Sequence, residues 1–339
     1  RRRAELCQSA RFSNSQPRNG GGSGLLLRVG KSFGLFFVLP CSQRQTRTHE
    51  RSNHIMSSYQ PRRSRCSVSI YLQSSPSRIC HCPASPDIVF TSGPRCGLNV
   101  FDLRTQPASP VDTFMHPLAS FQDCGATSSA LDWSIINEGY VVSGSDNGKV
   151  CVWDALNQYK SPVVEFPPPQ EMIVRVGRFR PFITECVCWH PSDSSLIFSS
   201  DMSGNVHQCD LRQKAQTCIL KRDEACLCVS VNPVERFLLA TAGGSGSVCL
   251  WDNRNLSHPL HTMIGHAKAV NQLRWNPFNC SSLASCGMDG RVCLWDLGRI
   301  GSAITPEQER EGPPELVFVH GGHTDSVIDV SWNPNVLIV

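Results

Sequence analysis

The 339-residue sequence lacks several features that would indicate an enzyme, a metalloprotein or a membrane protein. It contains no glycine-rich phosphate loop, no nucleophile elbow and no histidine cluster at metal-ligand spacing, so nothing in it supports catalysis. Its cysteines form no Cys-x-x-Cys pair, which argues against a zinc site. The apolar run at residues 33–39 is much shorter than the roughly 20 residues that span a bilayer. We therefore expect a protein that is not an enzyme, without a cofactor, a metal ion or a membrane segment.

Charge is distributed unevenly along the chain. Residues 1–77 contain 13 Lys and Arg against only Glu5 and Glu50, which gives +11, whereas the whole chain carries +4. Residues 78–339 must therefore carry −7, which favours cationic partners and disfavours direct binding of nucleic acid by this part. Residues 1–77 also show no sustained hydrophobic period, so we predict a disordered basic extension, with a targeting peptide as the alternative. The first methionine is Met56, so either the sequence is a fragment or residues 1–55 are not the native N-terminus.

A repeating pattern begins near residue 78 and continues to the end of the chain. Each unit contains two apolar strands, a turn of Gly, Ser, Asp or Asn, and a third strand that ends in an Asp. These strand ends are Phe101-Asp102, Trp153-Asp154, Cys209-Asp210, Trp251-Asp252 and Trp295-Asp296. A second series of strand-ending residues, Trp133, Trp189, Val231, Trp275 and Trp332, keeps step with the first. Repeats of about 40 to 45 residues, lengthened where loops are inserted, indicate an all-β propeller with four antiparallel strands in each blade.

These motifs resemble the WD-repeat proteins. Five complete units and the opening of another are recognisable in residues 78–339, so the ring is expected to be incomplete and poorly stable alone. The fifth complete unit predicts a structural network in which His266 bonds to Asp289, and Ser285 and Trp295 extend the chain of hydrogen bonds. A catalytic His-Asp pair is the minor alternative. The turn at residues 243–246 has no Asp, so we expect packing to hold that blade instead.

The 18 cysteines are interpreted as reduced thiols, because a chain of this size does not need a disulfide framework. Cys151, Cys249 and Cys293 occupy the same strand position in three units. Small buried apolar residues are therefore the preferred interpretation of this set.

Within the WD-repeat class, the segment from Trp295 to Asn335 resembles the retinoblastoma-associated, MSI-type histone-binding proteins. The resemblance rests on Gly-Pro-Pro-Glu-Leu at residues 312–316, His-Gly-Gly-His-Thr at 320–324 and Ser-Trp-Asn-Pro-Asn at 331–335. It implies a seven-bladed propeller that acts as a scaffold subunit in chromatin assembly, histone-modifying or remodelling complexes. The implied partners are core histones three and four, and the implied location is the nucleus, with the cytoplasm as a second location.

The resemblance also implies two binding places. In the first, the Pro-Pro loop, carboxylates would pair with the arginines of a histone helix. Its residues are Glu307, Glu309, Glu311, Pro313, Pro314 and Glu315. The second is the mouth of the central channel, where Arg78 and Glu185 fall on matching positions and would contact a basic peptide. A solvated loop carboxylate is the alternative interpretation of Glu185.

A different function is indicated by three short motifs, Asp-Leu-Arg at 102–104 and 210–212 and Asp-Asn-Arg at 252–254. They resemble the Asp-x-Arg box by which many WD-repeat proteins dock the adaptor of a cullin ubiquitin ligase. On this interpretation the chain is a substrate receptor, and Arg104, Arg212 and Arg254 contact the adaptor. Ordinary surface arginines at the ends of blades are the alternative.

Overall fold

The protein is described from a computed structural model, which covers residues 36–38, 78–83, 85, 88–92, 98–102, 104, 117–121, 128–157, 161–168, 183–305, 310 and 312–332. These residues form β-strands, turns and short 3-10 segments, and no α-helix occurs among them. Glu307, Glu309 and Glu311 lie outside the described residues, as does nearly all of the predicted basic extension. The prediction of a disordered segment at 1–77 is therefore untested.

Five four-stranded antiparallel sheets, here called blades, follow one another along the chain. The first contains β2 (Arg78–His81), β3 (Ile88–Ser92), β4 (Leu98–Asp102) and β5 (Ala119–Phe121). The second contains β6 (Ser128–Trp133), β7 (Tyr140–Ser145), β8 (Val150–Asp154) and β9 (Val164–Phe166). The third contains β10 (Thr184–Trp189), β11 (Leu196–Asp201), β12 (Asn205–Asp210) and β13 (Ala215–Lys221). The fourth contains β14 (Cys226–Val231), β15 (Leu238–Gly243), β16 (Ser247–Asp252) and β17 (His261–Ile264). The fifth contains β18 (Val270–Trp275), β19 (Ser282–Gly287), β20 (Val292–Asp296) and β21 (Leu316–His320).

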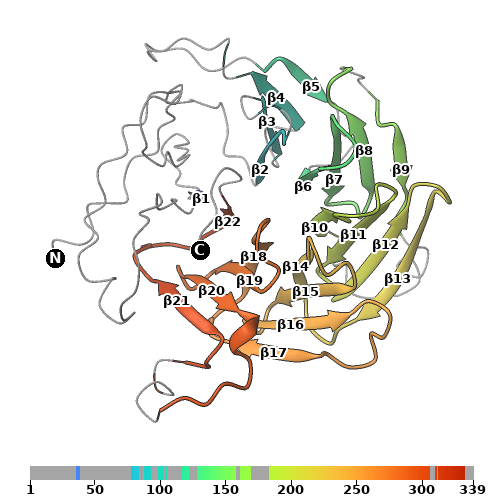
Figure 1. The fold of residues 1–339 in the computed structure, drawn as a ribbon. Helices are drawn as coiled ribbons and strands as arrows, with labels where there is room; N and C mark the ends of the chain where they lie inside the picture. Colours follow the sequence, from blue (N-terminus) through green and yellow to red (C-terminus); the bar gives the residue numbers. More distant parts are fainter. Residues whose placement is uncertain are drawn as a thin grey trace, which may run out of the picture.

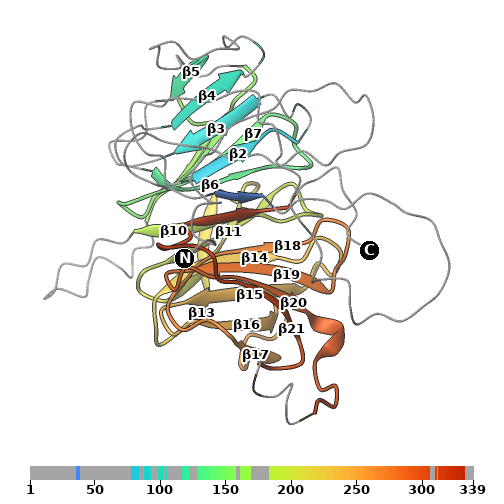
Figure 2. The ribbon, with the colours of Figure 1, turned by 90° about the vertical axis from the view of Figure 1, so that its left-hand side faces the viewer.

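The blades are arranged around a common centre, as in a β-propeller (Figure 1). Their first strands, β2, β6, β10, β14 and β18, lie innermost and adjoin one another, and their fourth strands lie at the periphery. A further strand, β22 (Asp329–Ser331), lies beside β18 and pairs in parallel with β1 (Phe36–Val38). The all-β propeller, with five complete units and the first strand of another, is thus confirmed. In Figure 2 the 3-10 helix between β20 and β21 lies outside the blades.

The register is the same from blade to blade, which explains the repeating sequence markers. The residue before each strand-ending Asp pairs with the same position of the second strand, as in Val141 with Trp153 and Leu283 with Trp295. The turn between the second and third strands needs a positive φ in four blades. Glycine provides it each time, at Gly148, Gly204, Gly246 and Gly290.

The core lies between neighbouring blades, where apolar residues of both sheets meet. Trp153 and Trp295 are fully buried there. All cysteines among the described residues are free, and Cys151, Cys249 and Cys293 are buried at one shared register, as expected of small apolar residues. Burial raises the pKa of the Cys293 thiol to about 12, so this thiol stays protonated.

Candidate binding surfaces and the networks that support them

The connection between β20 and β21 is the insertion that contains the Pro-Pro loop. The chain leaves β20 through the 3-10 helix η4 (Leu297–Arg299), whose first turn is capped by the Asp296 carboxylate. Leu297 and Ile300 pack against the apolar core. The two ends of the insertion meet where the Asp296 N–H donates to the carbonyl oxygen of Glu315 at 2.8 Å. The insertion therefore has a closed and packed base.

The carboxylate of Glu315 is buried at the end of this insertion. Glu315 is 4% exposed, and its Oε1 lies 2.9 Å from Nε2 of His261, the first residue of β17. Because β17 belongs to the fourth blade and β21 to the fifth, this bond ties the insertion to the neighbouring blade. A buried carboxylate is stable only with such a partner. The placement differs from the expectation that Glu315 offers its carboxylate to a ligand, and it gives this residue an anchoring position.

The turn formed by Pro313 and Pro314 is held by the side chain of Leu316. A Cβ atom on Gly312 would lie only 2.9 Å from Cδ2 of Leu316, and Gly312 has a φ of +140°, which L side chains rarely adopt. The Leu316 N–H donates to the Pro313 carbonyl at 3.0 Å. A Cβ atom on Gly265, next to β17, would lie 3.2 Å from the same Leu316 carbon. The Pro-Pro turn thus packs against the fourth blade as well as its own. Of the charged residues near the tip of the insertion, the structure describes Arg310, which is exposed.

The channel mouth is formed by irregular inner strands. In β6, β10, β14 and β18 the register shifts at the second residue, which is Ser129, Glu185, Leu227 or Asn271. A β-bulge re-aims the side chain at the irregular position and is frequent beside functional sites. Burial raises the pKa of the Glu185 carboxyl, and the positive charge of Arg78 opposes this shift. The structure thus brings the two predicted mouth residues into one electrostatic environment.

Arg78 does more than line the mouth. Its side chain crosses from β2 to the fifth blade, where Nη2 donates to the carbonyl of Asn271 at 3.1 Å. Its Nη1 donates to the carbonyl of Ile328, just before β22, at 2.6 Å. Arg78 is 7% exposed, so the guanidinium is largely committed to these contacts. This differs from the expectation of a peptide-contacting residue, because Arg78 joins the first blade to the last segment of the ring.

A second contact across the ring was not predicted. Nη1 of Arg274 in β18 lies 3.1 Å from Oδ1 of Asp132 in β6, three blades away along the chain. The other carboxylate oxygen accepts the backbone N–H of Trp189 in β10 at 2.8 Å. The signal in the sequence was the position of the two residues, because each directly precedes the Trp that ends its inner strand. Opposite charges at equivalent positions of separate inner strands can meet across the centre of a propeller.

The fifth blade contains the predicted structural network. The indole N–H of Trp295 donates to Oγ of Ser285 at 2.8 Å, and Nε2 of His266 lies 2.7 Å from the same oxygen. Nδ1 of His266 lies 3.1 Å from both oxygens of Asp289. Burial lowers the pKa of His266, although Asp289 opposes this shift. All four side chains are therefore joined, within a blade rather than in an accessible cleft, as a structural role requires.

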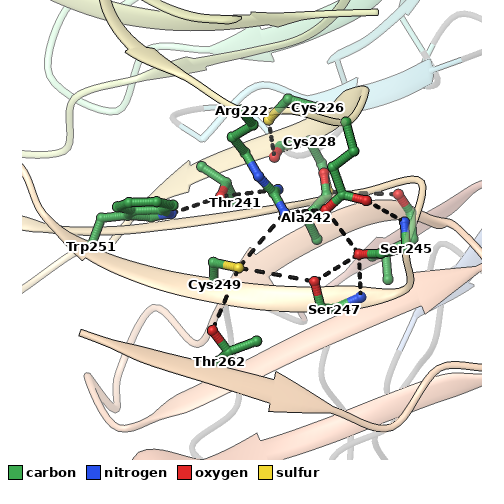
Figure 3. Close-up of polar contacts among 12 residues, drawn as sticks. Arg222, Cys226, Cys228, Thr241, Ala242, Ser245, Ser247, Cys249, Trp251 and Thr262 are labelled. Carbon is green, nitrogen blue, oxygen red and sulfur yellow. Dashed lines mark hydrogen bonds and ion pairs between the residues drawn. The ribbon is translucent and has the colours of Figure 1, made fainter. Parts of the chain in front are cut away.

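The fourth blade contains a network of different chemistry, shown in Figure 3. The Trp251 indole donates to Oγ1 of Thr241 at 2.8 Å, and Nη1 of Arg222 donates to the same oxygen at 3.3 Å. Arg222 also pairs with Glu224, whose carboxylate accepts the Ser245 N–H at 2.7 Å and its hydroxyl at 2.8 Å. Arg222 stands four residues before its inner strand, as His266 does in the next blade. The expectation that packing alone holds this blade was wrong, because Glu224 supplies the carboxylate that the turn lacks.

The third blade uses yet another pair. Asp201 ends β11, and its Oδ2 lies 3.0 Å from Nε2 of His207 in β12. Backbone and side-chain N–H groups of Asn205 donate to the same carboxylate. His207 occupies the position at which three other blades have a cysteine. Each of these three networks therefore connects the turn of its blade to an adjoining strand through different residues.

The three predicted adaptor-docking arginines adopt one geometry. Arg104, Arg212 and Arg254 each follow the strand-ending Asp by two residues and bind it through both Nε and Nη2. Their side chains are 57%, 65% and 64% exposed, which leaves the outer edge of each guanidinium accessible. The bond from Arg254 lowers the pKa of its Asp partner to about 2. The guanidinium of Arg254 also lies over the ring of Phe237, 4.6 Å from its centroid.

Two classes of site were sought without result in the described part of the chain. It contains no group of three or more His, Cys, Asp or Glu side chains arranged to hold a metal ion. Likewise, none of its helical segments has the length and apolar composition needed to cross a membrane.

Comparison with known families identifies repeats in the chain. The family described as WD domain, G-beta repeat matches residues 119–154, 216–252 and 257–296. Each match begins on or near the outer strand of one blade and continues through the three inner strands of the next. WD40 repeats are therefore present, and each repeat overlaps two blades, which links neighbouring blades covalently.

Proposed function

We propose that this propeller with WD40 repeats is a non-catalytic, histone-binding scaffold subunit of complexes that assemble, modify or remodel chromatin. WD40 propellers are generally scaffolds that hold other proteins, and the repeats here fit that role. The nucleus is the proposed place of action, with a further pool in the cytoplasm. The observation that carries the proposal is the insertion, because its base is closed and tied to two blades while its acidic segment extends beyond them.

The chemistry of the insertion suits a basic helical partner. Glu307, Glu309 and Glu311 follow one another at alternate positions in the segment directly before the anchored Pro-Pro turn. Carboxylates recognise arginine by paired, charge-assisted hydrogen bonds, so histones three and four provide matching groups. The charge of −7 on residues 78–339 also attracts a basic partner during encounter.

The channel mouth supplies a second contact for the same class of partner. Glu185 is held at a β-bulge and is only partly exposed, so a basic side chain of a histone tail would find a carboxylate with little competition from water. Arg78 is largely committed to the ring, which leaves Glu185 as the group that selects for positive charge.

Binding of a purified histone three–four pair to the full chain tests this function. We expect micromolar or tighter binding that weakens with salt, and a loss on the order of tenfold when Glu309→Ala and Glu311→Ala are combined. Glu138→Ala, in the loop between β6 and β7, is the matched control, because it removes a carboxylate far from the insertion. A folded sample that does not bind the histones at micromolar concentration would exclude this function.

A second candidate function is favoured by the three forked arginines. Arg104, Arg212 and Arg254 have the same orientation on three blades and keep exposed N–H groups, as a docking surface for the adaptor of a cullin ubiquitin ligase requires. On this hypothesis, the adaptor co-purifies with the chain, and Arg212→Ala combined with Arg254→Ala abolishes the association. Unchanged co-purification would show that these arginines are ordinary surface residues.

A further inference from the structure

We infer that His261 is a positioning residue for partner binding by the insertion, through its bond to Glu315. This inference rests on the proposed function, in which the acidic segment of the insertion binds a basic partner. His261 belongs to β17, in a blade that the insertion does not leave or enter, so neither sequence motifs nor the resemblance pointed to it. Its role would be to fix the direction in which the acidic segment extends.

The contact is placed where it controls the end of the insertion. Glu315 uses its backbone carbonyl to close the base with Asp296 at 2.8 Å, and its side chain to reach His261 at 2.9 Å. One residue therefore closes the insertion upon its own blade and ties it to the next. The side chain of Glu315 is 5% exposed and that of His261 is 34% exposed, so the bond is buried on the side of the insertion.

Loss of His261 has a defined physical consequence. The Glu315 carboxylate would be left buried beside apolar surface, and such a group is expelled toward water or protonated. If it turns outward, the Pro313–Leu316 turn must move with it, since Leu316 packs beside Gly312 and Gly265. The carboxylates that precede this turn would then lose their fixed direction, and ordering them again would weaken binding.

An alternative role for Glu315 gives the opposite expectations. If its carboxylate contacted the partner directly, His261 would compete with that partner, and removing the imidazole would strengthen binding or leave it unchanged. If Glu315 is an anchor, removal of either member of the pair weakens binding to a similar degree. Removal of both is then no worse than removal of one, because each substitution breaks the same bond.

The test is a double-mutant cycle on the full chain, with the purified histone three–four pair as the probe and Kd as the readout. We expect His261→Ala and Glu315→Ala each to raise Kd about tenfold, and the double variant to show a similar rise rather than a hundredfold one. His261→Gln retains an N–H donor and is expected to restore most of the affinity. His258→Ala is the matched control, because His258 is an exposed histidine in the same connection to β17.

Three outcomes separate the possibilities. If the wild-type chain does not bind the histones, the proposed function fails and this inference fails with it. If the wild type binds but His261→Ala binds equally well or better, the function stands and the positioning role of His261 is refuted. The role is refuted also if His261→Gln binds as weakly as His261→Ala while circular dichroism shows both to be folded. Glu315→Gln, which removes the charge but keeps the shape, provides a second variant should Glu315→Ala not fold.

Discussion

The contact between Asp132 and Arg274 should stabilise the propeller across its centre. It joins β6 to β18, and the side chains are 17% and 24% exposed, so solvent screens the pair only in part. Asp132→Ala removes the partner of a largely buried guanidinium and the acceptor of the Trp189 N–H, which lies 2.8 Å away. Breaking a buried pair from one side costs about 3 to 5 kcal/mol, and partial exposure reduces this to about 2 to 4 kcal/mol.

The expected change is large enough for thermal unfolding to resolve. For a domain of this size, 1 kcal/mol shifts the melting temperature by about 2 to 4 °C, so Asp132→Ala should lower it by roughly 4 to 16 °C. Arg274→Ala should have an effect of similar size. The double variant should lose less than the sum of the two single effects, because each single variant leaves the other charge without its partner. Glu165→Ala breaks the exposed pair with Lys149 and should cost at most about 1 kcal/mol.

The pH dependence of the Arg274→Ala variant gives an independent check. Burial raises the pKa of Asp132, and Arg274 opposes that shift, so removal of Arg274 must raise the pKa further. A carboxyl group with a raised pKa in the folded state loses stability as the pH rises from its unfolded pKa through its folded pKa. The destabilisation by Arg274→Ala should therefore be larger at pH 8 than at pH 5. Single effects below about 1 kcal/mol, with no coupling and no pH dependence, would refute a stabilising contact across the ring.

Three further predictions concern the other networks. Arg78→Ala should destabilise the fold by about 2 to 4 kcal/mol in chemical denaturation, because two buried hydrogen bonds from a charged donor are lost, whereas Arg236→Ala at an exposed site should have little effect. Stability should fall as the pH drops from about 6.5 toward 4, because burial lowers the folded-state pKa of His266, and that of His323 to about 4, so the unfolded chain binds the extra protons; His323→Asn should make this decline shallower, and an unchanged pH profile would contradict it. Arg222→Ala should cost about 1 to 3 kcal/mol, equally at pH 5 and pH 8, because the guanidinium does not titrate in this range; a strong pH dependence would exclude this account.

The sequence predicted the repeat architecture because its markers are local. A Trp or other apolar residue before an Asp, and a glycine in a turn, each report on one strand and its immediate neighbour. The network of His266, Ser285, Asp289 and Trp295 could be predicted for the same reason. All four residues lie within one repeat, at positions set by that repeat.

Contacts between repeats could not be predicted in this way. Arg78 was recognised as a residue of the channel mouth, but its partners at Asn271 and Ile328 lie 193 and 250 residues away. A sequence pattern gives the position of a side chain on its strand and does not show which distant carbonyl it will meet. The same limit applies to Glu315, whose charge indicated a ligand contact, whereas its bond to His261 depends on how two neighbouring blades are placed.

Substitution of one network by another was also beyond the reach of single-position reasoning. The missing Asp in the turn at residues 243–246 indicated a blade without polar support, because each position was compared separately with its counterpart. Three changes act together there: Arg222 replaces a histidine, Thr241 replaces a serine, and Glu224 supplies the carboxylate from another loop. A buried guanidinium requires a carboxylate near it, so Arg222 and Glu224 were the available signal.

The choice of network bears on the proposed binding surface. The insertion leaves the fifth blade, whose network depends on a histidine, and is tied through Glu315 to the fourth blade, whose network depends on Arg222. Arginine remains charged at every physiological pH, whereas an imidazole can gain a proton as the pH falls. His261 therefore extends from the blade whose polar support does not change with pH. A fixed platform on that side allows the acidic segment to keep its direction even when the network of its own blade weakens, which is what recognition of a basic helix by several carboxylates at once requires.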